Sequence, residues 1–358
     1  METPTYVIIM AGGIGTRFWP VSRTRYPKQF HDILGTGRSL LQETVRRFTK
    51  VCPPENFFIV TNKEYMALVR EQVPSVPHDN ILGEPYRRNT APCVAYAAYK
   101  IAQRDPDANL IVTPADAMIL DTEAFIEKIR VALKTTRKDD KIVTIGIKPT
   151  RPDTNYGYIQ MRRNSDPDGV IKVNTFTEKP NAELAEEFYQ SGEFVWNAGI
   201  FVWNAKTVKN SFMEFLPHLS EFIEEASVHF YTDEEEQAIE KAYSHCHPVS
   251  IDYGIMEHAR NVFVLPCECG WSDLGTWSAL YDVAEKDEQG NVVQGEPLLF
   301  ETKNCLIRSD DKRLLVAQGL EGYLVAEYED VVLICKREQT MRIKSFLEAA
   351  RERGEDFV

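Results

Sequence analysis

Residues 7–30 of the chain read VIIMAGGIGTRFWPVSRTRYPKQF, and this stretch decides the fold. Its first four residues are apolar and lead into three closely spaced glycines, Gly12, Gly13 and Gly15. A short apolar run that ends at turn residues predicts a buried β-strand. Glycines after such a strand let backbone N–H groups approach a phosphate closely. The stretch therefore predicts an α/β protein with a phosphate-binding loop after its first strand.

Strand-like and helix-like segments alternate along the N-terminal part of the chain. Buried strands are predicted at residues 7–10, 56–62, 109–116 and 141–147. Helices are predicted between these strands at residues 39–49, 91–104 and 124–134, and in the less regular middle of the chain at residues 183–190 and 211–231. This alternation favours a Rossmann-like, doubly wound and mostly parallel mixed sheet. Ligands of such sheets bind beyond the carboxyl ends of the strands, where both the glycines and Asp116 lie.

The pattern changes near residue 290. Short strand-like segments follow one another at residues 304–309, 313–318, 322–328 and 330–336, and a helix is predicted at residues 340–353. Closely spaced short strands are typical of a small all-β domain. We therefore expect a catalytic domain at residues 1–288 and a C-terminal β domain with a terminal helix at residues 289–358.

Composition limits the classes of function. The 358 residues carry a formal net charge of -13, which disfavours a general affinity for nucleic acid or an anionic membrane. No apolar run approaches the roughly 20 residues of a membrane span, and the N-terminus lacks the basic region of a signal peptide. The seven cysteines are scattered and odd in number, as expected of free thiols in a reducing compartment. We expect a cytoplasmic protein.

Two common phosphate-loop patterns do not fit the glycine cluster. In the dinucleotide pattern G-x-G-x-x-G counted from Gly13, the sixth position is Phe18, and no Gly-Lys-Ser/Thr follows as in a Walker A loop. Arg17 can hold phosphate oxygens bidentately, and Lys28 supplies a second cation. The alternative is an ordinary glycine turn with surface cations, but Trp19-Pro20 and Pro27-Lys28-Gln29 favour phosphate binding.

Nine short motifs, of which the first two lie in the opening stretch, are spread along nearly the whole chain. They are AGGIGTRFWPVSR (11–23), PKQF (27–30), GEPYRRNTAP (83–92), TPAD (113–116), NYGYI (155–159), FTEKP (176–180), WNAGIF (196–201), SIDYGIME (250–257) and GWSDLGTW (270–277). In this order they resemble the nucleotide-sugar pyrophosphorylases, and within them the mannose-1-phosphate guanylyltransferase (GDP-mannose pyrophosphorylase) branch. The resemblance implies a glycosyltransferase-A-like nucleotidyltransferase fold, a short left-handed β-helix at the C-terminus and a homodimer.

The resemblance also implies a reaction, in which GTP and α-D-mannose 1-phosphate give GDP-mannose and diphosphate. The sugar phosphate attacks the α-phosphorus in line and is already ionised at neutral pH, so no general base is required. Catalysis then rests on positioning and on neutralising negative charge. We expect Arg17 and Lys28 to grip the triphosphate, Lys28 nearest the α-phosphate, and the loop to contribute nucleotide-binding groups at Gly12, Gly13, Gly15 and Thr16.

Two aspartates are candidates for metal binding. Asp116 follows a predicted buried strand, and Asp273 lies in a turn between two tryptophans. The resemblance implies that they hold one Mg²⁺, an ion that takes one or two carboxylates and completes its coordination with phosphates and water. Alternatively, Asp116 caps a turn and Asp273 caps a helix. The HCH and CEC triplets at residues 245–247 and 267–269 do not match zinc-site spacings and are interpreted as loop histidines and free thiols.

The resemblance assigns the sugar phosphate to Gly157, Glu178, Lys179, Asn197 and Asp252. Lys179 resembles the lysine that meets the phosphate, while Glu178 and Asn197 resemble residues that hold sugar hydroxyls. Gly157 leaves room for the sugar ring. Asp252 has three open interpretations: it orients Asn197 or Lys179, it contacts the sugar, or it caps a helix that begins at the next residue.

Glu84 is a candidate for base selection. Related enzymes that use thymidine or uridine nucleotides resemble one another in having glutamine here. Guanine presents two adjacent donors, N1–H and the exocyclic amine, and an ionised carboxylate can accept both. We therefore predict that Glu84 selects guanine, with Arg88, Asn89 and Thr90 lining the base and ribose. The alternative is a solvent-facing glutamate.

The sequence departs from the family pattern at two positions. Ala117 replaces the usual histidine after PAD, and His258 replaces the usual lysine after IME. A sibling enzyme would use another hexose 1-phosphate or nucleotide. A non-catalytic GDP-mannose-binding module would be expected to lose Arg17, Lys28 or the two aspartates, which are all present. The failed G-x-G-x-x-G pattern disfavours a nicotinamide oxidoreductase. A fused phosphomannose isomerase activity is expected to be absent.

Overall fold

The computed structural model describes residues 3–137, 139–165, 169–309 and 313–358. It divides into two compact units. The first comprises Met1–Gly12, Val45–Ala115 and Ile119–Trp271, and the second comprises Gly13–Thr44, Asp116–Met118 and Ser272–Val358. The segment after the first strand thus belongs to the same unit as the C-terminal domain. The domain boundary at residue 288 stays a prediction.

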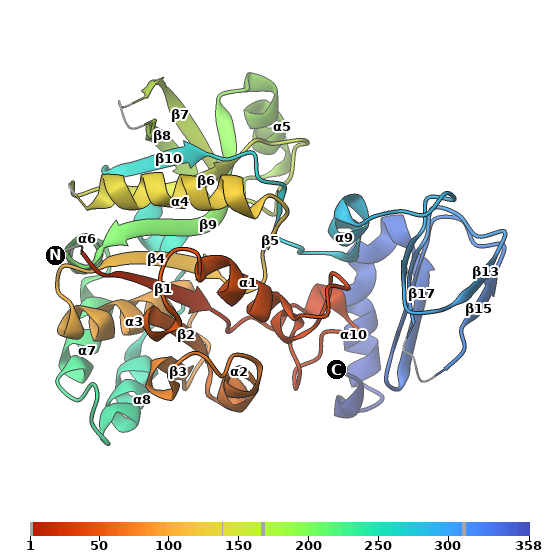
Figure 1. The fold of residues 1–358 in the computed structure, drawn as a ribbon, viewed down its shortest axis with the longest axis horizontal. Coiled ribbons are helices and arrows are strands. Elements are labelled where there is room, and N and C mark those ends of the chain that lie inside the picture. Colours follow the sequence, from red (N-terminus) through yellow and green to blue (C-terminus); the bar gives the residue numbers. More distant parts are fainter. Residues whose placement is uncertain (1–2, 138, 166–168, 310–312) are drawn as a thin grey trace. The chain divides into compact units, whose positions relative to one another are not determined.

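A nine-stranded mixed sheet forms the first unit, in the order β3-β2-β1-β4-β9-β6-β10-β8-β7 (Figure 1). Its strands are β1 (Thr5–Met10), β2 (Phe57–Asn62), β3 (Ile81–Glu84), β4 (Asn109–Pro114), β6 (Ile142–Ile147), β7 (Tyr158–Ser165), β8 (Ile171–Thr177), β9 (Phe194–Asn204) and β10 (Val262–Pro266). The strands from β3 to β4 run parallel, whereas β9 runs antiparallel to β4 and β6. The predicted doubly wound, mixed α/β fold is confirmed.

Helices cover both faces of this sheet. Val7, Ile8 and Ile9 of β1 are all fully buried, as expected for a strand without a solvent-facing side. Ile8 belongs to a core shared with α3 (Thr90–Arg104), α6 (Ala205–Phe215), α7 (Pro217–Ser227) and α8 (Glu235–His245). On the other face, α4 (Thr122–Thr136) packs against β6 and β9 (Figure 1). The unit also contains α2 (Met66–Gln72) and α5 (Ala182–Ser191).

The carboxyl ends of β1 and β4 lie side by side. Met10 pairs with Pro114 in the parallel register, and the N–H of Ala115 donates to the carbonyl of Met10 at 3.0 Å. Strands β2 and β3 follow on one side of β1 and β4 lies on the other, so the strand order reverses here. Such a switch point is where open α/β sheets bind ligands.

The single helix predicted over residues 211–231 is wrong. The chain instead forms α6, ending at Phe215, and α7, beginning at Pro217. Proline lacks the N–H needed to continue a helix and pushes the preceding residue out of the helical region. Leu216 accordingly has φ -133° and ψ 55°. The break creates a helical hairpin instead of one long helix.

The second unit is built around the C-terminal β domain. Its strands are β12 (Val292–Gln294), β13 (Leu298–Phe300), β14 (Leu306–Arg308), β15 (Val316–Gln318), β16 (Tyr323–Tyr328) and β17 (Val331–Lys336). Strand β14 pairs in parallel with β12 and β16, and β13 pairs in parallel with β15. Parallel pairing of such short, successive strands gives the expected β-helix-like appendage, and β17 closes it by antiparallel pairing with β16. The chain also forms the helix α1 (Leu40–Phe48). Two short strands, β5 (Met118–Ile119) and β11 (Trp271–Ser272), pair with each other in a separate sheet.

A buried core ties the phosphate-loop segment to the C-terminal domain within this second unit. Phe18 and Trp19 pack in one cluster with residues of α9 (Trp277–Val283) and α10 (Ile343–Arg351). The indole N–H of Trp19 donates to the carbonyl of Phe357 at 2.7 Å. The terminal helix predicted at residues 340–353 is α10, whose apolar residues Ile343 and Leu347 are buried in this cluster. No helix in the described parts of the chain is long and apolar enough to cross a membrane.

Candidate active site

The glycine loop folds tightly against the Pro-Lys-Gln segment in the second unit. Gly15 has φ +69°, and a Cβ atom built on it would lie 2.6 Å from Cβ of Lys28, so only glycine fits there. The side-chain amide of Gln29 donates to the carbonyl of Gly13 at 2.9 Å. Thr16, Arg17 and the next residue form a single 3-10 turn instead of opening an α-helix. The loop is therefore shaped by its contacts with residues 28 and 29.

Lys28 is the centre of the predicted catalytic set. Its side chain is 3% exposed, and its Nζ atom lies 2.8 Å from Oδ2 of Asp116. The same ammonium donates to the main-chain carbonyls of Asp273 and Leu274, at 3.1 and 2.9 Å. A buried ammonium needs this many acceptors to offset its lost hydration. The structure therefore gathers Lys28, Asp116 and the Asp273 turn around one positive charge.

Asp273 caps a turn and does not cap a helix. Its Oδ1 atom accepts the N–H of Gly275 at 3.0 Å, while α9 begins later and is capped by Thr276. This Asx-type contact uses one carboxylate oxygen. The side chain of Asp116 is 38% exposed, so its carboxylate is accessible as well as paired.

The chemistry of this donor set fits Mg²⁺. The described residues contain no group of three or more His, Cys, Asp or Glu side chains placed to hold a metal ion. Two carboxylates are the number that Mg²⁺ commonly takes from a protein when phosphates and water supply the rest. Asp116 and Asp273 could therefore hold Mg²⁺ together with a bound polyphosphate.

Glu84 lies at the end of β3 in the first unit and is buried, with 7% of its surface exposed. Its Oε1 atom accepts the hydroxyl proton of Tyr243 at 3.1 Å. Its Oε2 atom would lie 3.1 Å from a Cβ atom built on Gly12. Burial raises the pKa of Glu84 to about 8, and the Tyr243 hydrogen bond acts in the opposite direction. Glu84 is thus not the solvent-facing glutamate of the alternative interpretation.

Arg88 and Asn89 precede α3, which begins at Thr90, and each of the three residues has a local structural role. Asn89 has φ +67°, and its side-chain oxygen accepts the N–H of Thr90 at 2.9 Å. The hydroxyl of Thr90 accepts the N–H of Ile251 at 2.9 Å, beside Asp252. Nε of Arg88 donates to the main-chain carbonyl of Tyr243 at 3.3 Å. The Thr90 bond thus fixes the start of α3 to the residue that precedes Asp252.

The predicted sugar-phosphate residues all lie in the first unit. Glu178 and Lys179 follow β8, and Asn197 lies within β9. Gly157 precedes β7, and Asp252 begins a short π-helical segment. The main-chain N–H of Asn197 donates to the carbonyl of Gly157 at 2.8 Å. The side-chain amide of Asn197 donates to Oδ1 of Asp252 at 2.9 Å. A Cβ atom built on Gly157 would lie 2.4 Å from Oε2 of Glu178 and 3.3 Å from Cβ of Asn197. The lack of a side chain at Gly157 therefore lets Glu178 and Asn197, the two residues predicted to bind sugar hydroxyls, lie close to the backbone.

Asp252 and Glu178 share a crowded negative environment. Burial raises the pKa of Asp252 to about 7, with the Glu178 charge as the next cause, while Lys179 and the Asn197 hydrogen bond act in the opposite direction. Lys179 forms an ion pair with Glu178 and is itself in the left-handed region, with φ +48°. Of the three interpretations of Asp252, its contact with Asn197 supports an orienting role.

Comparison with known proteins decides the family. Residues 6–290 match the family described as nucleotidyl transferase, and residues 295–349 match the MannoseP isomerase/GMP-like beta-helix domain. The chain belongs to the nucleotidyl transferase family. The resemblance to nucleotide-sugar pyrophosphorylases and the β-helix-like C-terminal domain are thereby confirmed.

Relatives of this nucleotidyl transferase cover most of its length. A Klebsiella pneumoniae protein named mannose-1-phosphate guanylyltransferase is 36% identical over 350 residues, which are 96% of this chain and 74% of that protein. The alginate biosynthesis protein AlgA of Pseudomonas putida is 34% identical over 357 residues, 97% of this chain and 72% of that protein. A crystal structure from Thermus thermophilus, described as a mannose-1-phosphate geranyltransferase, is 31% identical with a TM-score of 0.88 and covers 98% of this chain and 100% of that one.

Sequence reasoning about this nucleotidyl transferase missed two contacts. The first is the bond from the hydroxyl of Tyr243, on α8, to Glu84. The second is the bond from the main-chain N–H of Glu178 to Oε1 of Glu257 at 2.9 Å. Neither Tyr243 nor Glu257 follows a strand or a glycine turn, and only the SIDYGIME motif that contains Glu257 gave a signal. Of the two departures, Ala117 is buried, and His258 is exposed with its ring 6.3 Å from that of Phe215.

Proposed function

We propose that this nucleotidyl transferase is a mannose-1-phosphate guanylyltransferase, which converts GTP and α-D-mannose 1-phosphate to GDP-mannose and diphosphate. The name of the Klebsiella pneumoniae relative supports the substrate pair. The observation that carries the proposal is the ammonium of Lys28 against Asp116 and the Asp273 turn, beside a glycine loop. This is a charge-neutralising arrangement, as phosphoryl-group chemistry requires.

The proposed reaction exchanges one P–O bond for another. An oxygen of the sugar phosphate forms a bond to the α-phosphorus of GTP, and the bond from that phosphorus to the β-bridging oxygen breaks. The electron pair leaves with diphosphate, and no proton transfer is needed. Arg17 and Lys28 would stabilise the charge on the phosphates, and the loop at Gly13, Gly15 and Thr16 would position them.

We propose Asp116 and Asp273 as the residues that hold Mg²⁺. When bound, the ion would neutralise phosphate charge and orient the triphosphate. Asp116→Asn and Asp273→Asn should each raise the Mg²⁺ concentration needed for half-maximal turnover and weaken Mn²⁺ binding in the presence of GTP, read by electron paramagnetic resonance. Asp107→Asn is the matched control, because Asp107 is an exposed aspartate paired with Lys206. Unchanged Mn²⁺ binding in both site variants would contradict the assignment.

Glu178, Lys179 and Asn197 would bind the sugar phosphate, with Gly157 leaving room for the ring and Asp252 orienting Asn197. A carboxylate and an amide suit sugar hydroxyls, since together they accept and donate hydrogen bonds. Glu84 would select guanine, because its carboxylate can accept both N1–H and the exocyclic amine. With Glu84→Gln the preference for GTP over ATP and UTP should fall, and an unchanged preference would remove Glu84 from this role.

A diphosphate-release assay tests the whole proposal. It crosses GTP, ATP, UTP and dTTP with mannose, glucose and galactose 1-phosphates, each with and without Mg²⁺. We expect turnover with GTP and mannose 1-phosphate that EDTA abolishes. A sibling specificity would give its highest rate with another pair. Absence of turnover with every pair would leave only a binding function and overturn the proposal.

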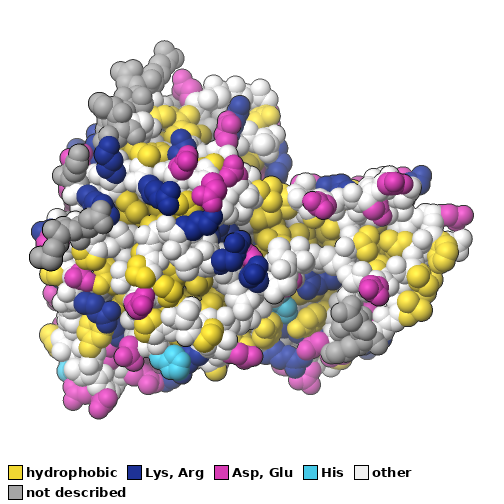
Figure 2. All heavy atoms as spheres, viewed as in Figure 1, with side chains coloured by type: hydrophobic (Ala, Val, Ile, Leu, Met, Phe, Trp, Pro, Cys, Tyr) yellow, Lys and Arg dark blue, Asp and Glu magenta, His cyan; other side chains and the backbone are white. Residues whose placement is uncertain are grey.

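Assembly and compartment are further parts of this proposal. The protein would act in the cytoplasm, which its seven free cysteines support. It would form a homodimer, and sedimentation at micromolar concentration should give twice the monomer mass. Ile343 and Leu347 of α10 are buried within their own unit and are therefore not available to a second subunit. Hydrophobic side chains gather over β13 and β15, where Leu298, Phe300 and Val316 are exposed (Figure 2).

A further inference from the structure

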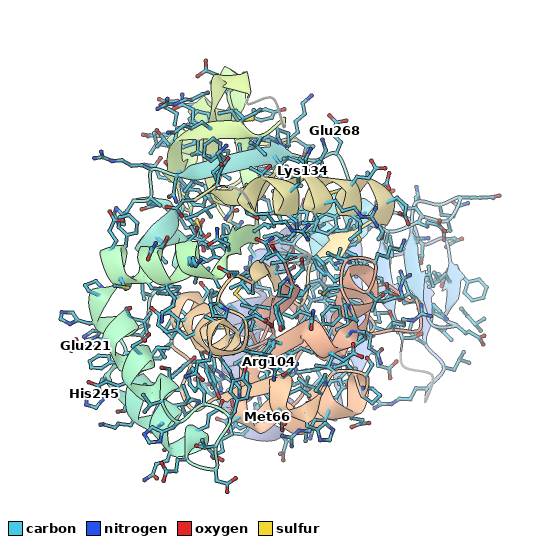
Figure 3. All side chains as sticks on the ribbon, turned by 60° about the vertical axis from the view of Figure 1, so that its left-hand side comes forward. Met66, Arg104, Lys134, Glu221, His245 and Glu268 are labelled. Atoms are coloured by element: carbon cyan, nitrogen blue, oxygen red, sulfur yellow. The ribbon has the colours of Figure 1, made fainter. Side chains whose placement is uncertain are left out.

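Tyr243 is a buried tyrosine whose two polar groups both contact predicted nucleotide-binding residues. It lies near the end of α8, whose last residue, His245, is exposed and labelled in Figure 3. Its hydroxyl donates to Oε1 of Glu84 at 3.1 Å, and its carbonyl accepts from Nε of Arg88 at 3.3 Å. The ring has no exposed surface. A phenol in such a place has few other partners, so this bond fixes the orientation of Glu84.

The Tyr243 hydrogen bond uses one oxygen of Glu84, and the second oxygen faces Gly12. Oε2 would lie 3.1 Å from a Cβ atom at Gly12, the first glycine after β1. Gly83, the residue before Glu84, packs against the first residue of α2. A Cβ atom on Gly83 would lie 2.4 Å from Sδ of Met66, which is labelled in Figure 3. The backbone at Gly83 is therefore packed tightly, while the Tyr243 hydroxyl restrains one oxygen of the Glu84 carboxylate.

We propose that Tyr243 is the positioning residue for guanine recognition: its hydroxyl orients Glu84 and favours the carboxylate form, which accepts the base through its other oxygen. This inference rests on the proposed function. One lone pair of the carboxylate is used by Tyr243, and the remaining ones suffice for both guanine donors. Binding of the guanine nucleotide therefore requires the carboxylate form and releases a proton whenever Glu84 is protonated in the free protein.

The groups around Glu84 determine how readily that proton leaves. Burial raises the pKa of Glu84 to about 8, and the hydrogen bond from Tyr243 is the interaction that lowers it. Burial and the Glu84 charge raise the pKa of Tyr243 well above its usual range, so the phenol remains a donor. Cys93 on α3 also faces Glu84, and its pKa is raised well above 9.0, first by burial and then by that charge. Tyr96 adds a further contribution to the shift at Tyr243. Of these groups, the Tyr243 hydroxyl is the one that favours ionised Glu84.

The test is nucleotide binding by Tyr243→Phe at different pH values. GDP-mannose is the probe, because its diphosphate diester has no group that titrates near neutral pH. In the unsubstituted protein at pH 7, calorimetry in buffers of different ionisation enthalpy should detect proton release on binding, because the raised pKa leaves Glu84 largely protonated in the free protein. The affinity should rise about tenfold per pH unit below that pKa and level off above it. Proton release in the unsubstituted protein does not depend on the folding of any variant.

Tyr243→Phe should shift the midpoint of this profile upward by about one pH unit, and affinity at pH 7 should fall about tenfold. The preference for GDP over IDP, which lacks the exocyclic amine, should also fall. Tyr99→Phe is the matched control, because Tyr99 is a buried tyrosine whose hydroxyl bonds to Ser220 at 2.7 Å. Its midpoint should equal that of the unsubstituted protein.

Two outcomes separate the inference from the proposed function. If the unsubstituted protein makes GDP-mannose but Tyr243→Phe has the same midpoint as Tyr99→Phe, the role of Tyr243 is wrong and the function stands. The role is equally wrong if GDP-mannose binds without proton release. If the unsubstituted protein neither binds GDP-mannose nor turns over GTP with mannose 1-phosphate, the proposed function fails, and the inference fails with it.

Discussion

The Nζ atom of Lys28 lies 2.8 Å from Oδ2 of Asp116, and these two residues are 88 positions apart in the chain. The ammonium also donates to two carbonyls of the Asp273 turn. One buried cation thus organises both aspartates proposed to hold Mg²⁺. Electrostatic catalysis depends on charged groups that are held in fixed positions in this way.

Replacement of Lys28 should remove most of the activity. In Lys28→Met the side chain keeps its approximate length, but the charge is lost, so kcat should fall by about 10²–10³-fold. Two carbonyls and one carboxylate also lose a donor, which should lower the free energy of unfolding by about 1–3 kcal/mol. Steady-state kinetics and urea unfolding measure the two effects. Lys50→Met, at an exposed lysine paired with Glu123, should leave kcat unchanged. A kcat within tenfold of the unsubstituted value would contradict the role of Lys28.

A methyl group at Gly157 should impair sugar binding selectively. In Gly157→Ala the new Cβ atom would lie 2.4 Å from Oε2 of Glu178, so Glu178 must move. Such overpacking commonly costs about 1–3 kcal/mol, and KM for mannose 1-phosphate should rise by about one to two orders of magnitude, with KM for GTP little changed. Gly354→Ala is the control, since its Cβ atom would meet nothing nearer than 3.6 Å. An equal rise in both KM values would mean that the substitution acts on the fold as a whole.

Local patterns in the sequence predict what depends on neighbouring residues. The buried strand at β1 and the glycines after it are defined by their own apolar and conformational character, and both are found where expected. The break at Leu216 was also encoded locally, by Pro217, but the apolar periodicity on either side of it concealed the break. Such errors arise when apolar periodicity is given more weight than a helix-breaking proline.

Contacts between distant parts of the chain could not be predicted in the same way. Tyr243 and Glu84 are separated by 159 positions, and nothing in the spacing of α8 residues indicates which strand end its inner face will contact. The sequence likewise did not indicate that Gly13–Thr44 belongs to the same unit as the C-terminal domain. Motifs located the predicted site residues, whereas the side chains that orient them depend on packing that only the folded chain reveals.

The stability of the protein should fall as pH rises through neutrality, in part because of Asp252. The folded-state pKa of Asp252 is raised from 3.8 to about 7, so the folded form binds its proton more tightly than the unfolded chain does. The stabilisation is complete below about pH 4 and is lost as pH rises to about 7. Asp252→Asn should reduce this slope in urea unfolding measured from pH 4 to pH 8, while Asp107→Asn should keep it. Glu84, whose pKa is also raised, contributes in the same direction, so the test is the difference between the two variants. Identical slopes would show that Asp252 does not titrate in this range.

Arg23 should stabilise the second unit far more than its neighbour Arg25. The Arg23 side chain is fully buried and donates to the carbonyls of Pro20, Tyr328 and Asp356 at 2.9–3.2 Å. It also pairs with Asp330 at 2.6 Å, whereas the Arg25 side chain is 59% exposed.

In Arg23→Met the three carbonyls lose their donor, and an unsatisfied buried acceptor costs about 1–3 kcal/mol, so the free energy of unfolding should fall by at least that amount. Arg25→Met removes only an exposed ion pair with Glu329 and should change it by less than about 1 kcal/mol. Urea unfolding of both variants measures the difference. Because Arg23 belongs to the same segment as Arg17 and Lys28, its loss should also raise KM for GTP. Equal stability of the two variants would mean that the buried network does not hold the phosphate-loop segment to the C-terminal domain.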